Sequence, residues 1–397
     1  MKLFISIVAL AASVMAGSDI ERILHDSNDQ FSTRMFSEVA KSEPTKSVVI
    51  SAFSVLSPLA QLALASVGET HDQTLRIIGF PNDNVTREVF TDVNKRLRAV
   101  SEVDLQLVSR IYVKTGTELN EQFAAVSRDT FGSDVKNVDF EKNIETAGEI
   151  NKWVEDNTNN RIKDLVSPDS LGADTAAVLV NAIYFKGKWK IPFDKTATKE
   201  NDFYVAKDKT VKVPMMYLSN DFKYGENKEL NAKLLEMAHE GEKSSLLIVL
   251  PNEVDGIHSL IEKLNDPSVL AKAVESMYTL EVDVALPRFK IETTTNLKDI
   301  LIKMGCTRLF TPHEARLNNL LKGQNDLYIS EAIQKAFIEV NEEGAEAAAA
   351  NHVSIDVRAS FRSTAEFVAD RPFVFVIRCK TEQLNTKINT FTGIFTT

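Results

Sequence analysis

The chain has 397 residues, of which 44% are hydrophobic, and carries a formal net charge of −10 at pH 7. This acidic balance argues against DNA or RNA as a partner, because contacts to phosphate groups need a basic face. The 2 cysteines are too few for a disulfide framework, and the 15 glycines and 11 prolines are spread along the chain without a linker or a repeat, so we expect one large domain.

The N-terminus has the pattern of a secretory signal peptide. Lys2 precedes an apolar stretch at residues 3–12, and small residues, among them Ala16, complete a cleavage signal. The apolar stretch is far shorter than the ~20 residues that span a bilayer. We therefore predict a secreted, extracellular protein whose signal peptide is residues 1–16 and whose single domain is residues 17–397.

Helical patterns dominate the first half of the chain, beginning at a cap near residue 18. One N-glycosylation sequon, Asn84-Val85-Thr86, follows Pro81 in what we expect to be a polar turn. Asn84 is therefore a predicted glycosylation site. We interpret a small basic cluster further on as a solvated helix face and not as a polyanion site: Lys95, Arg96 and Arg98.

Strand signals come later in the sequence. Residues 105–113 alternate between apolar and mostly polar side chains, whereas 177–185 and 246–250 are continuous apolar runs, typical of strands covered on both faces. A helix predicted over residues 149–165 would cover such a sheet. Further candidate strands near the C-terminus are 337–340, 373–377 and 391–395. Without a regular βαβ alternation, the predicted fold class is α+β with large sheets.

Catalytic motifs are absent from the sequence. There is no G-x-S-x-G elbow, H-E-x-x-H motif, phosphate-binding G-x-x-x-x-G-K or Rossmann glycine fingerprint. The 6 histidines are scattered, and none stands four residues from another or beside a cysteine, as metal ligands usually do. We expect the adjacent pairs His71-Asp72 and His313-Glu314 to be ordinary surface, because neighbours on a helix or strand do not face each other. We predict neither an enzyme nor a metal or cofactor site.

Residues 342–358, EEGAEAAAANHVSIDVR, combine two opposing signals. Alanine and glutamate favour a helix or an exposed loop. The alternation is that of a strand, since the face from Ala345 to Val357 is apolar apart from Asn351, while the other face carries every charge of the alternating run. A segment able to be both loop and strand indicates a conformational switch.

Several separated motifs resemble the serpin family over essentially the whole mature chain. The hinge of inhibitory serpins is similar to EEGAEAAAA at 342–350, and the family's breach strand to NAIYFKG at 181–187 with Trp189. Other similar segments are 51–54, 150–166, 370–373 and 391–393. The sequence is most similar to insect haemolymph serpins of the antitrypsin-like, alaserpin group. The resemblance implies a serpin fold of three β-sheets and roughly nine helices, with an exposed reactive-centre loop at about residues 342–366.

The resemblance also implies suicide inhibition of a serine protease, whose covalent acyl-enzyme is trapped when the cleaved loop enters a central sheet. In inhibitory serpins the residue before the cut bond lies fourteen after the hinge glycine, and fourteen after Gly344 is Arg358. The predicted reactive bond is therefore Arg358–Ala359, and the predicted partner is a trypsin-like protease. A cut further on would lengthen the tether and favour substrate behaviour. Alternative reactive residues are Phe361, Arg362 and Ser363.

Hinge, breach and shutter residues follow from the same resemblance. Small residues at the inserting positions Ala345, Ala347 and Ala349, after Glu342 and Gly344, favour inhibition because a charge there would be buried at large cost.

The polar shutter beneath the opening sheet would contain Ser51, Ser54 and Asn181, with Gln334 where the family commonly has a histidine. A glutamine can still bond to Asn181, without the pH response of a histidine. The resemblance places an ion pair between Glu342 and Arg288 at the breach, with Trp189 beside it.

Two functions from different classes are therefore open. One is a secreted inhibitor of trypsin-like serine proteases; the other is a non-inhibitory serpin-fold binding or carrier protein whose loop is merely cleaved. Non-inhibitory members usually interrupt the small-residue run with bulky, charged or proline residues, and residues 345–350 contain none except the outward-facing Glu346. This favours the inhibitor. We expect a monomer, and neither a nucleic acid nor a membrane as partner.

Overall fold

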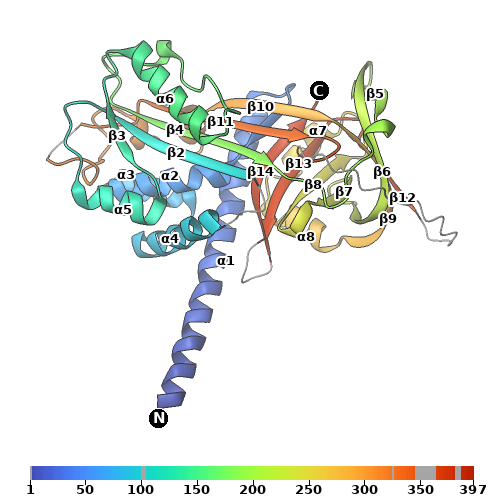
Figure 1. Cartoon of the computed structure of the whole chain (residues 1–397), viewed down its shortest axis with the longest axis horizontal. Coiled ribbons are helices and arrows are strands. Elements are labelled where there is room, and N and C mark those ends of the chain that lie inside the picture. The colour runs from blue at the N-terminus through green and yellow to red at the C-terminus, as the bar shows by residue number, and fades with distance from the viewer. Residues whose placement is uncertain (1, 100–103, 324–325, 345–363, 381–385) are drawn as a thin grey trace.

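The structure is a computed structural model that describes residues 2–99, 104–323, 326–344, 364–380 and 386–397, with the backbone alone for 2–18, 96–99 and 104. The elements it contains confirm the predicted α+β fold class (Figure 1). Nine α-helices form within the described ranges: α1 Lys2–Ser42, α2 Ala52–Ala65, α3 Gly68–Ile78, α4 Asp83–Ala99, α5 Glu121–Phe131, α6 Asn143–Asn157, α7 Ile257–Lys263, α8 Pro267–Glu275 and α9 Leu297–Lys303.

The described strands are β1 Val48–Ile50, β2 Asp104–Lys114, β3 Val135–Val138, β4 Ala177–Lys186, β5 Lys199–Ala206, β6 Lys209–Asn227, β7 Ala232–Ala238, β8 Ser244–Pro251, β9 Tyr278–Pro287, β10 Phe289–Asn296, β11 Glu331–Val340, β12 Ala365–Val368, β13 Phe373–Lys380 and β14 Lys387–Phe395. By hydrogen bonding they form two sheets, of nine and five strands. The resemblance implies three sheets. Two of the expected sheets are joined into one because the 19-residue β6 belongs to both: its first residues pair with β5 and its last with β7.

The five-stranded sheet has the order β10-β11-β4-β2-β3. Its central strand, β4, is buried at every position but the last, as its continuous apolar sequence predicts for a strand covered on both faces. β11 lies parallel to β4, whereas β10 pairs antiparallel with β11 and β2 antiparallel with β4. The pair formed by β4 and β11 is therefore the one parallel contact at the centre of this sheet.

Helices α2 and α6 cover opposite faces of the five-stranded sheet. Along β4, Leu179 packs into the core that contains α2, while Val180 and Tyr184 pack with α6, because neighbouring side chains of a strand point to opposite faces. α2 is buried at 13 of its 14 positions, as expected of a helix that is apolar around its whole circumference.

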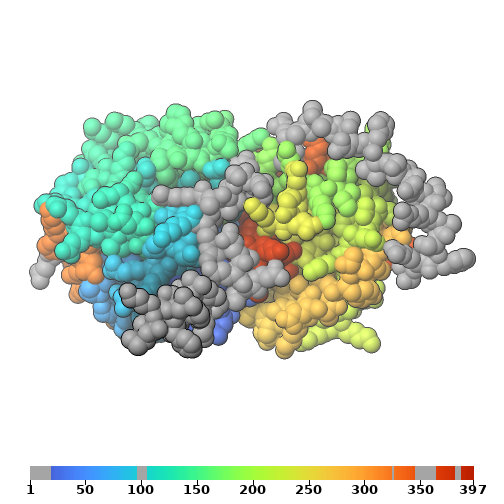
Figure 2. Space-filling model, turned by 60° about the horizontal axis from the view of Figure 1, so that its bottom comes forward, coloured from blue at the N-terminus to red at the C-terminus, as the bar shows by residue number. Residues whose placement is uncertain are grey.

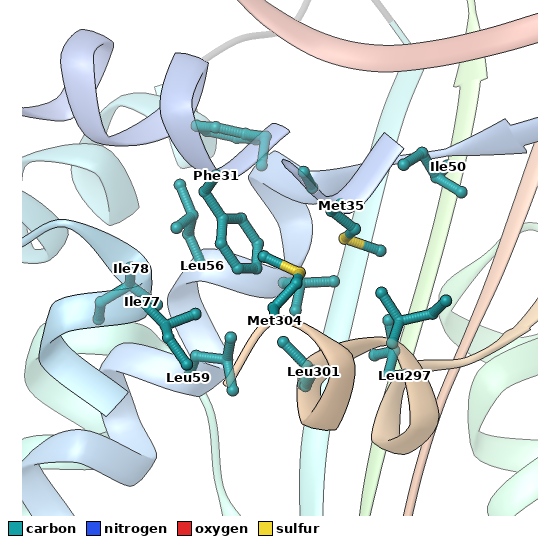
Figure 3. Close-up of a cluster of buried hydrophobic side chains, with 14 of the residues drawn as sticks. Phe31, Met35, Ile50, Leu56, Leu59, Ile77, Ile78, Leu297, Leu301 and Met304 are labelled. Carbon is teal, nitrogen blue, oxygen red and sulfur yellow. The ribbon is translucent and has the colours of Figure 1, made fainter. Parts of the chain in front are cut away.

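The main core joins α1, α2, α3 and α9. Figure 3 shows Phe31 and Met35 of α1 beside Leu56 and Leu59 of α2, with Met304 at the end of α9 close to them. All five side chains are buried in one hydrophobic cluster. In Figure 2 the left half of the molecule is mostly blue to green, with orange residues at its far edge, and the right half is mostly lime green to light orange.

Helix α1 is longer than predicted. We expected its first turn near residue 18, but the backbone is helical from Lys2, and its first part extends away from the rest of the molecule (Figure 1). No helix in the described part of the chain is long and apolar enough to cross a membrane. The signal peptide at residues 1–16 stays a prediction.

Candidate functional site

The candidate site follows the junction of β4 and β11, which we call the seam. The two strands pair from Val178–Glu331 to Phe185–Ile338. The chain then leaves β11 in a turn at residues 341–344, which we call the hinge turn. A strand formed after this turn and lying beside β11 would run antiparallel to β11, and also to β4, because β4 and β11 are parallel. It would therefore form a regular antiparallel ladder on both sides.

Four buried polar residues, which we call the shutter cluster, join the middle of the seam to the start of α2: Ser51, Ser54, Asn181 and Gln334. Gln334 Nε2 donates to Asn181 Oδ1 across the seam at 2.8 Å and to the Ser51 carbonyl oxygen at 2.8 Å. Gln334 Oε1 accepts from the Ser51 backbone N–H at 3.1 Å. Asn181 Nδ2 donates to the Ser54 carbonyl oxygen at 3.0 Å, and Ser54 Oγ donates to Asn181 Oδ1 at 2.7 Å.

The shutter cluster holds the seam closed without any charge. Each of its members is 0% exposed, and a buried polar group that loses its partner costs about 1–3 kcal/mol. Separating β4 from β11 breaks the bond between Gln334 and Asn181, so new partners must replace it. Because an amide does not titrate near neutral pH, this resistance does not depend on a proton.

The hinge turn is fixed by backbone hydrogen bonds from the segment that follows β4. Trp189 donates its indole N–H to the Asn341 carbonyl oxygen at 2.7 Å. Its backbone N–H donates to the Glu343 carbonyl oxygen at 3.2 Å. The Phe193 N–H donates to the Glu342 carbonyl oxygen at 2.8 Å. Trp189 is therefore more than core packing, since it fixes the conformation at which any inserting strand would begin.

Gly344 closes the hinge turn in a conformation that only glycine adopts without strain. Its φ is +76°, and a Cβ at this position would lie 2.4 Å from the Gly187 carbonyl oxygen and 2.5 Å from the Trp189 backbone nitrogen. The glycine thus lets the turn pack directly on the backbone after β4.

Glu342 and Arg288 meet at the end of the seam, the breach. Glu342 Oε1 lies 3.4 Å from Arg288 Nη1 and accepts a hydrogen bond from Thr198 Oγ1 at 2.8 Å. The Glu342 side chain is 5% exposed and that of Arg288 51% exposed. The buried carboxylate is therefore stabilised mainly by the hydroxyl, and the solvated guanidinium adds a weaker attraction. Glu343 pairs with Lys195 on the surface.

His239 belongs to the breach, although sequence reasoning did not single it out. Its ring stacks on Trp189 at 4.9 Å between centroids, and its Nδ1 lies 2.9 Å from Ser244 Oγ. Burial lowers the pKa of His239 to about 4, so the ring is neutral in the folded protein near pH 7. Gly187 makes room for the ring, because a Cβ at this position would lie 2.6 Å from it.

Several predicted site residues lie outside the described ranges: Ala345, Ala347, Ala349, Arg358, Ala359, Phe361, Arg362 and Ser363. In the basic cluster, Lys95 is an exposed residue of α4, while the side chains of Arg96 and Arg98 fall outside the description. The reactive bond, the inserting positions and the role of the basic cluster therefore stay predictions.

The turn predicted for the glycosylation sequon is wrong. Asn84 is exposed but lies in the first turn of α4, and Thr86 is buried, donating from Oγ1 to the Asn82 carbonyl oxygen at 2.8 Å. Asn82 Oδ1 accepts from the Val85 N–H at 3.0 Å, which is the pattern of a helix N-cap.

The expectation that His71 and Asp72 do not face each other is also wrong. His71 Nδ1 lies 2.9 Å from Asp72 Oδ1, and Nε2 lies 2.7 Å from Asp83 Oδ1. The imidazole bridges α3 and the start of α4, and these carboxylates raise the pKa of His71 against the opposing effect of burial. Within the described residues, no group of three or more His, Cys, Asp or Glu side chains could hold a metal ion.

Comparison with known proteins identifies the family of this chain. The family described as Serpin (serine protease inhibitor) matches residues 26–391. Alaserpin of Manduca sexta is 58% identical over 379 residues, which is 95% of this chain and 96% of that protein. Two Bombyx mori proteins are each 53% identical over 381 residues: Antitrypsin, covering 95% of this chain and 97% of its own length, and Antichymotrypsin-2, covering 96% and 100%.

Proposed function

The chain belongs to the serpin family and is a serine protease inhibitor rather than an enzyme, and we propose that it is a secreted suicide inhibitor of trypsin-like proteases. The relatives at this identity are named for two protease types, Antitrypsin and Antichymotrypsin-2, so the target class has to come from this chain's own loop. We further propose that it acts as a monomeric haemolymph glycoprotein carrying a glycan at Asn84.

The observation that carries the inhibitory mechanism is the parallel seam with the hinge turn at its end. The protease serine would attack the Arg358 carbonyl, break the bond to Ala359, release the new amino terminus and leave an ester to Arg358. Residues 345–358 would then enter the seam as a strand antiparallel to both neighbours. Such a strand of ~14 residues at ~3.3 Å each would carry the tethered protease ~46 Å.

The energy of insertion is sufficient to disturb the protease. New ladder hydrogen bonds at about 0.5–1.5 kcal/mol each, together with burial of Val353, Ile355 and Val357, give on the order of 10 kcal/mol. Losing one oxyanion donor costs a protease about 3 kcal/mol in transition-state stabilisation. The uncleaved state would accordingly be kinetically trapped, with the shutter cluster and the hinge turn resisting premature insertion.

Arg358 supports a trypsin-like target, because an arginine fits a specificity pocket with an aspartate at its base. Two alternatives are open. A cut after Phe361 would suit a chymotrypsin-like protease, and a cut at Arg362–Ser363 would suit another trypsin-like one. Both lengthen the tether and shift the outcome towards simple cleavage. The carrier function is the remaining alternative.

Mixing the purified chain with trypsin or chymotrypsin, followed by denaturing electrophoresis, tests the proposal. A covalent band above either partner supports trapping, whereas a clipped product alone supports the carrier. Mass spectrometry of the released C-terminal peptide identifies the cut: a peptide starting at Ala359 is expected, and one starting at Ser363 would overturn the assignment. Arg358→Ala should abolish the complex with trypsin, while the matched variant Arg362→Ala should leave it.

The hinge has its own test. Ala347→Glu should convert inhibition to cleavage without loss of the native fold, because the charge would be buried on insertion. Ala348→Glu, on the outward face of the same alternation, is the matched control and should retain complex formation. Equal yields of complex for the two variants would contradict insertion in the proposed register.

A further inference from the structure

His71 connects two helices at a cleft away from the seam. The cleft, of about 510 Å³, is lined by residues of α3, by the segment 80–82 and by the start of α4. His71 Nδ1 lies 2.9 Å from Asp72 Oδ1 on α3, and Nε2 lies 2.7 Å from Asp83 Oδ1 in the first turn of α4. One imidazole therefore contacts a carboxylate on each helix, and the contact with Asp83 bridges them.

These two contacts together require a protonated ring. A carboxylate only accepts hydrogen bonds, so each ring nitrogen must carry a hydrogen, as in the imidazolium, whereas a neutral imidazole has one N–H and one lone pair. If Nε2 loses the proton, its lone pair faces Asp83 and the bridge between the helices breaks. If Nδ1 loses it, the bond to Asp83 remains without the charge, and such a bond is roughly half as strong. Either neutral form weakens the bridge.

Other charged groups around α3 do not replace the two carboxylates. Arg76 is the other basic residue among the described cleft walls. On the elements packed against α3, α2 carries no ionisable residue, and α1 meets the other end of α3, where a hydroxyl donates to the Gly79 carbonyl oxygen. Arg308, Glu314 and Arg316 contact α3 through backbone groups.

The balance of these influences favours the charged ring. Burial alone would lower the pKa of His71, but the hydrogen bonds and negative charges of Asp83 and Asp72 outweigh it and raise the pKa above its ordinary value of 6.5. The His71 side chain is 22% exposed, so its proton can exchange with solvent. The bridge between α3 and α4 is therefore present in neutral solution and sensitive to alkali.

We propose that His71 is a proton-controlled latch, which fastens the first turn of α4 to α3 as the imidazolium and loosens it as the neutral ring. The sign follows from linkage: a group whose pKa is raised by folding contributes its full stabilisation below the unfolded value of 6.5 and loses it as pH rises through the folded value. The latch therefore opens on the alkaline side of neutrality. It lies outside the reactive loop, so the proposal does not rest on protease inhibition.

The first turn of α4 contains the groups that report on the latch. The Val85 N–H donates to Asn82 Oδ1 at 3.0 Å, and the Thr86 N–H donates to the Asn82 carbonyl oxygen at 3.0 Å. Both hydrogen bonds lie next to Asp83 in the chain. When the contact between Asp83 and His71 weakens, this turn should open more often and expose its amides to exchange with solvent.

Hydrogen–deuterium exchange of the intact chain at pH 6 and pH 8.5 tests the latch. The protein is made in bacteria, so that Asn84 carries no glycan, and protection is corrected for the intrinsic effect of pH on exchange. Peptides covering residues 83–90 should lose protection about fivefold at the higher pH. His71→Gln should show the same protection at both pH values. The matched variant His313→Gln, which removes an imidazole that is 83% exposed, should behave as the wild type.

Two carboxylate variants separate the bridge to α4 from the contact within α3. Asp83→Asn removes the negative partner on α4. Because Asp83 also interacts with the helix dipole at every pH, the decisive quantity is the change in protection between pH 6 and pH 8.5, which should vanish in this variant. Asp72→Asn leaves Asp83 in place and should retain the change.

Three outcomes contradict the latch. The first is equal protection of residues 83–90 at the two pH values in the wild type. The second is a loss of protection in His71→Gln as large as in the wild type, which would assign the response to another group. The third is the same pH response in Asp83→Asn and Asp72→Asn, which would show that the contact across the two helices does not carry it.

Discussion

The shutter cluster and the breach hold the same seam by opposite physical means. In the shutter cluster, neutral amides and hydroxyls such as Gln334 and Asn181 are 0% exposed and directly bonded. At the breach, the charged pair reaches solvent through Arg288, whose side chain is 51% exposed, while Glu342 is buried. Desolvated neutral bonds are costly to break and indifferent to salt and pH, whereas exposed charges are worth little and are screened. The seam should therefore resist opening mainly at its middle.

The largest effect should come from Gln334→Leu, which retains volume but removes every hydrogen bond that the Gln334 amide makes in the shutter cluster. The Ser51 N–H loses its partner in a site without solvent, and Asn181 Oδ1 keeps only the hydrogen bond from Ser54, so we expect a loss of about 3 kcal/mol in native-state stability. Inhibitory activity should also decay faster on warming, because the kinetic barrier falls. Urea unfolding followed by tryptophan fluorescence and timed activity assays measure both.

Gln61→Leu is the matched control. Gln61 is as deeply buried in α2, but neither amide atom of its side chain has a hydrogen-bond partner. Replacing it by an apolar residue of similar volume should leave stability unchanged or raise it. If both leucine variants destabilise equally, the hydrogen bonds of the shutter cluster are not what holds the seam.

Acid should act on the breach and leave the shutter cluster unaffected. Burial lowers the pKa of His239 to about 4 in the folded protein, against 6.5 for the exposed imidazole of the unfolded chain. Between these values the unfolded chain binds more protons, so stability is complete above about 6.5 and is lost as pH falls towards 4, by about 3 kcal/mol in total. Urea midpoints measured across this interval should show the fall.

The variant His239→Gln separates this contribution from other acid-sensitive groups. It should be less stable at neutral pH but should flatten the profile between pH 6.5 and 4, and a profile with an unchanged slope would assign the acid response elsewhere. Glu236, whose pKa is lowered chiefly by Arg378 and Lys387 against the effect of burial, is one such group.

A smaller effect is expected from Glu342→Gln. The amide can still accept the hydrogen bond from Thr198, but this bond is weaker than one to a carboxylate and the small attraction to Arg288 is lost as well. The urea midpoint should therefore fall by the equivalent of about 1 kcal/mol. Glu343→Gln, which affects the surface pair with Lys195, is the matched control and should be silent. Equal losses of stability in Glu342→Gln and Glu343→Gln would mean that the burial of Glu342 does not make it more important for stability than Glu343.

Sequence reasoning reached the shutter cluster and the breach pair because the family resemblance fixes their positions. Ser54, Asn181 and Gln334 are far apart in the chain, and nothing in their local patterns brings them together; the resemblance did. The fold class was also predictable, since continuous apolar runs such as β4 and β8 are strands buried on both faces.

Other features depend on tertiary contacts or on local signals that were misread. His239 meets Trp189 through an isolated bridge between distant segments, which no periodicity predicts. The turn assigned to Asn84 overlooked Asn82 as a helix cap. For His71, the pairing with Asp83 depends on how α3 and α4 meet, although the contact with Asp72 shows that neighbouring side chains can converge on one imidazole.

The smallest effect should come from Arg288→Gln, which tests directly whether the exposed charge at the breach contributes less than the buried bonds of the shutter cluster. Its partner Glu342 keeps the hydrogen bond from Thr198 at 2.8 Å, and a half-exposed guanidinium contributes only a few tenths of a kcal/mol. Wild type and variant should therefore converge in urea midpoint as salt rises to about 1 M, where the screening length falls to about 3 Å. A large loss that persists at high salt would show that Arg288 acts through packing, and the breach would then resemble the shutter cluster more than its exposure indicates.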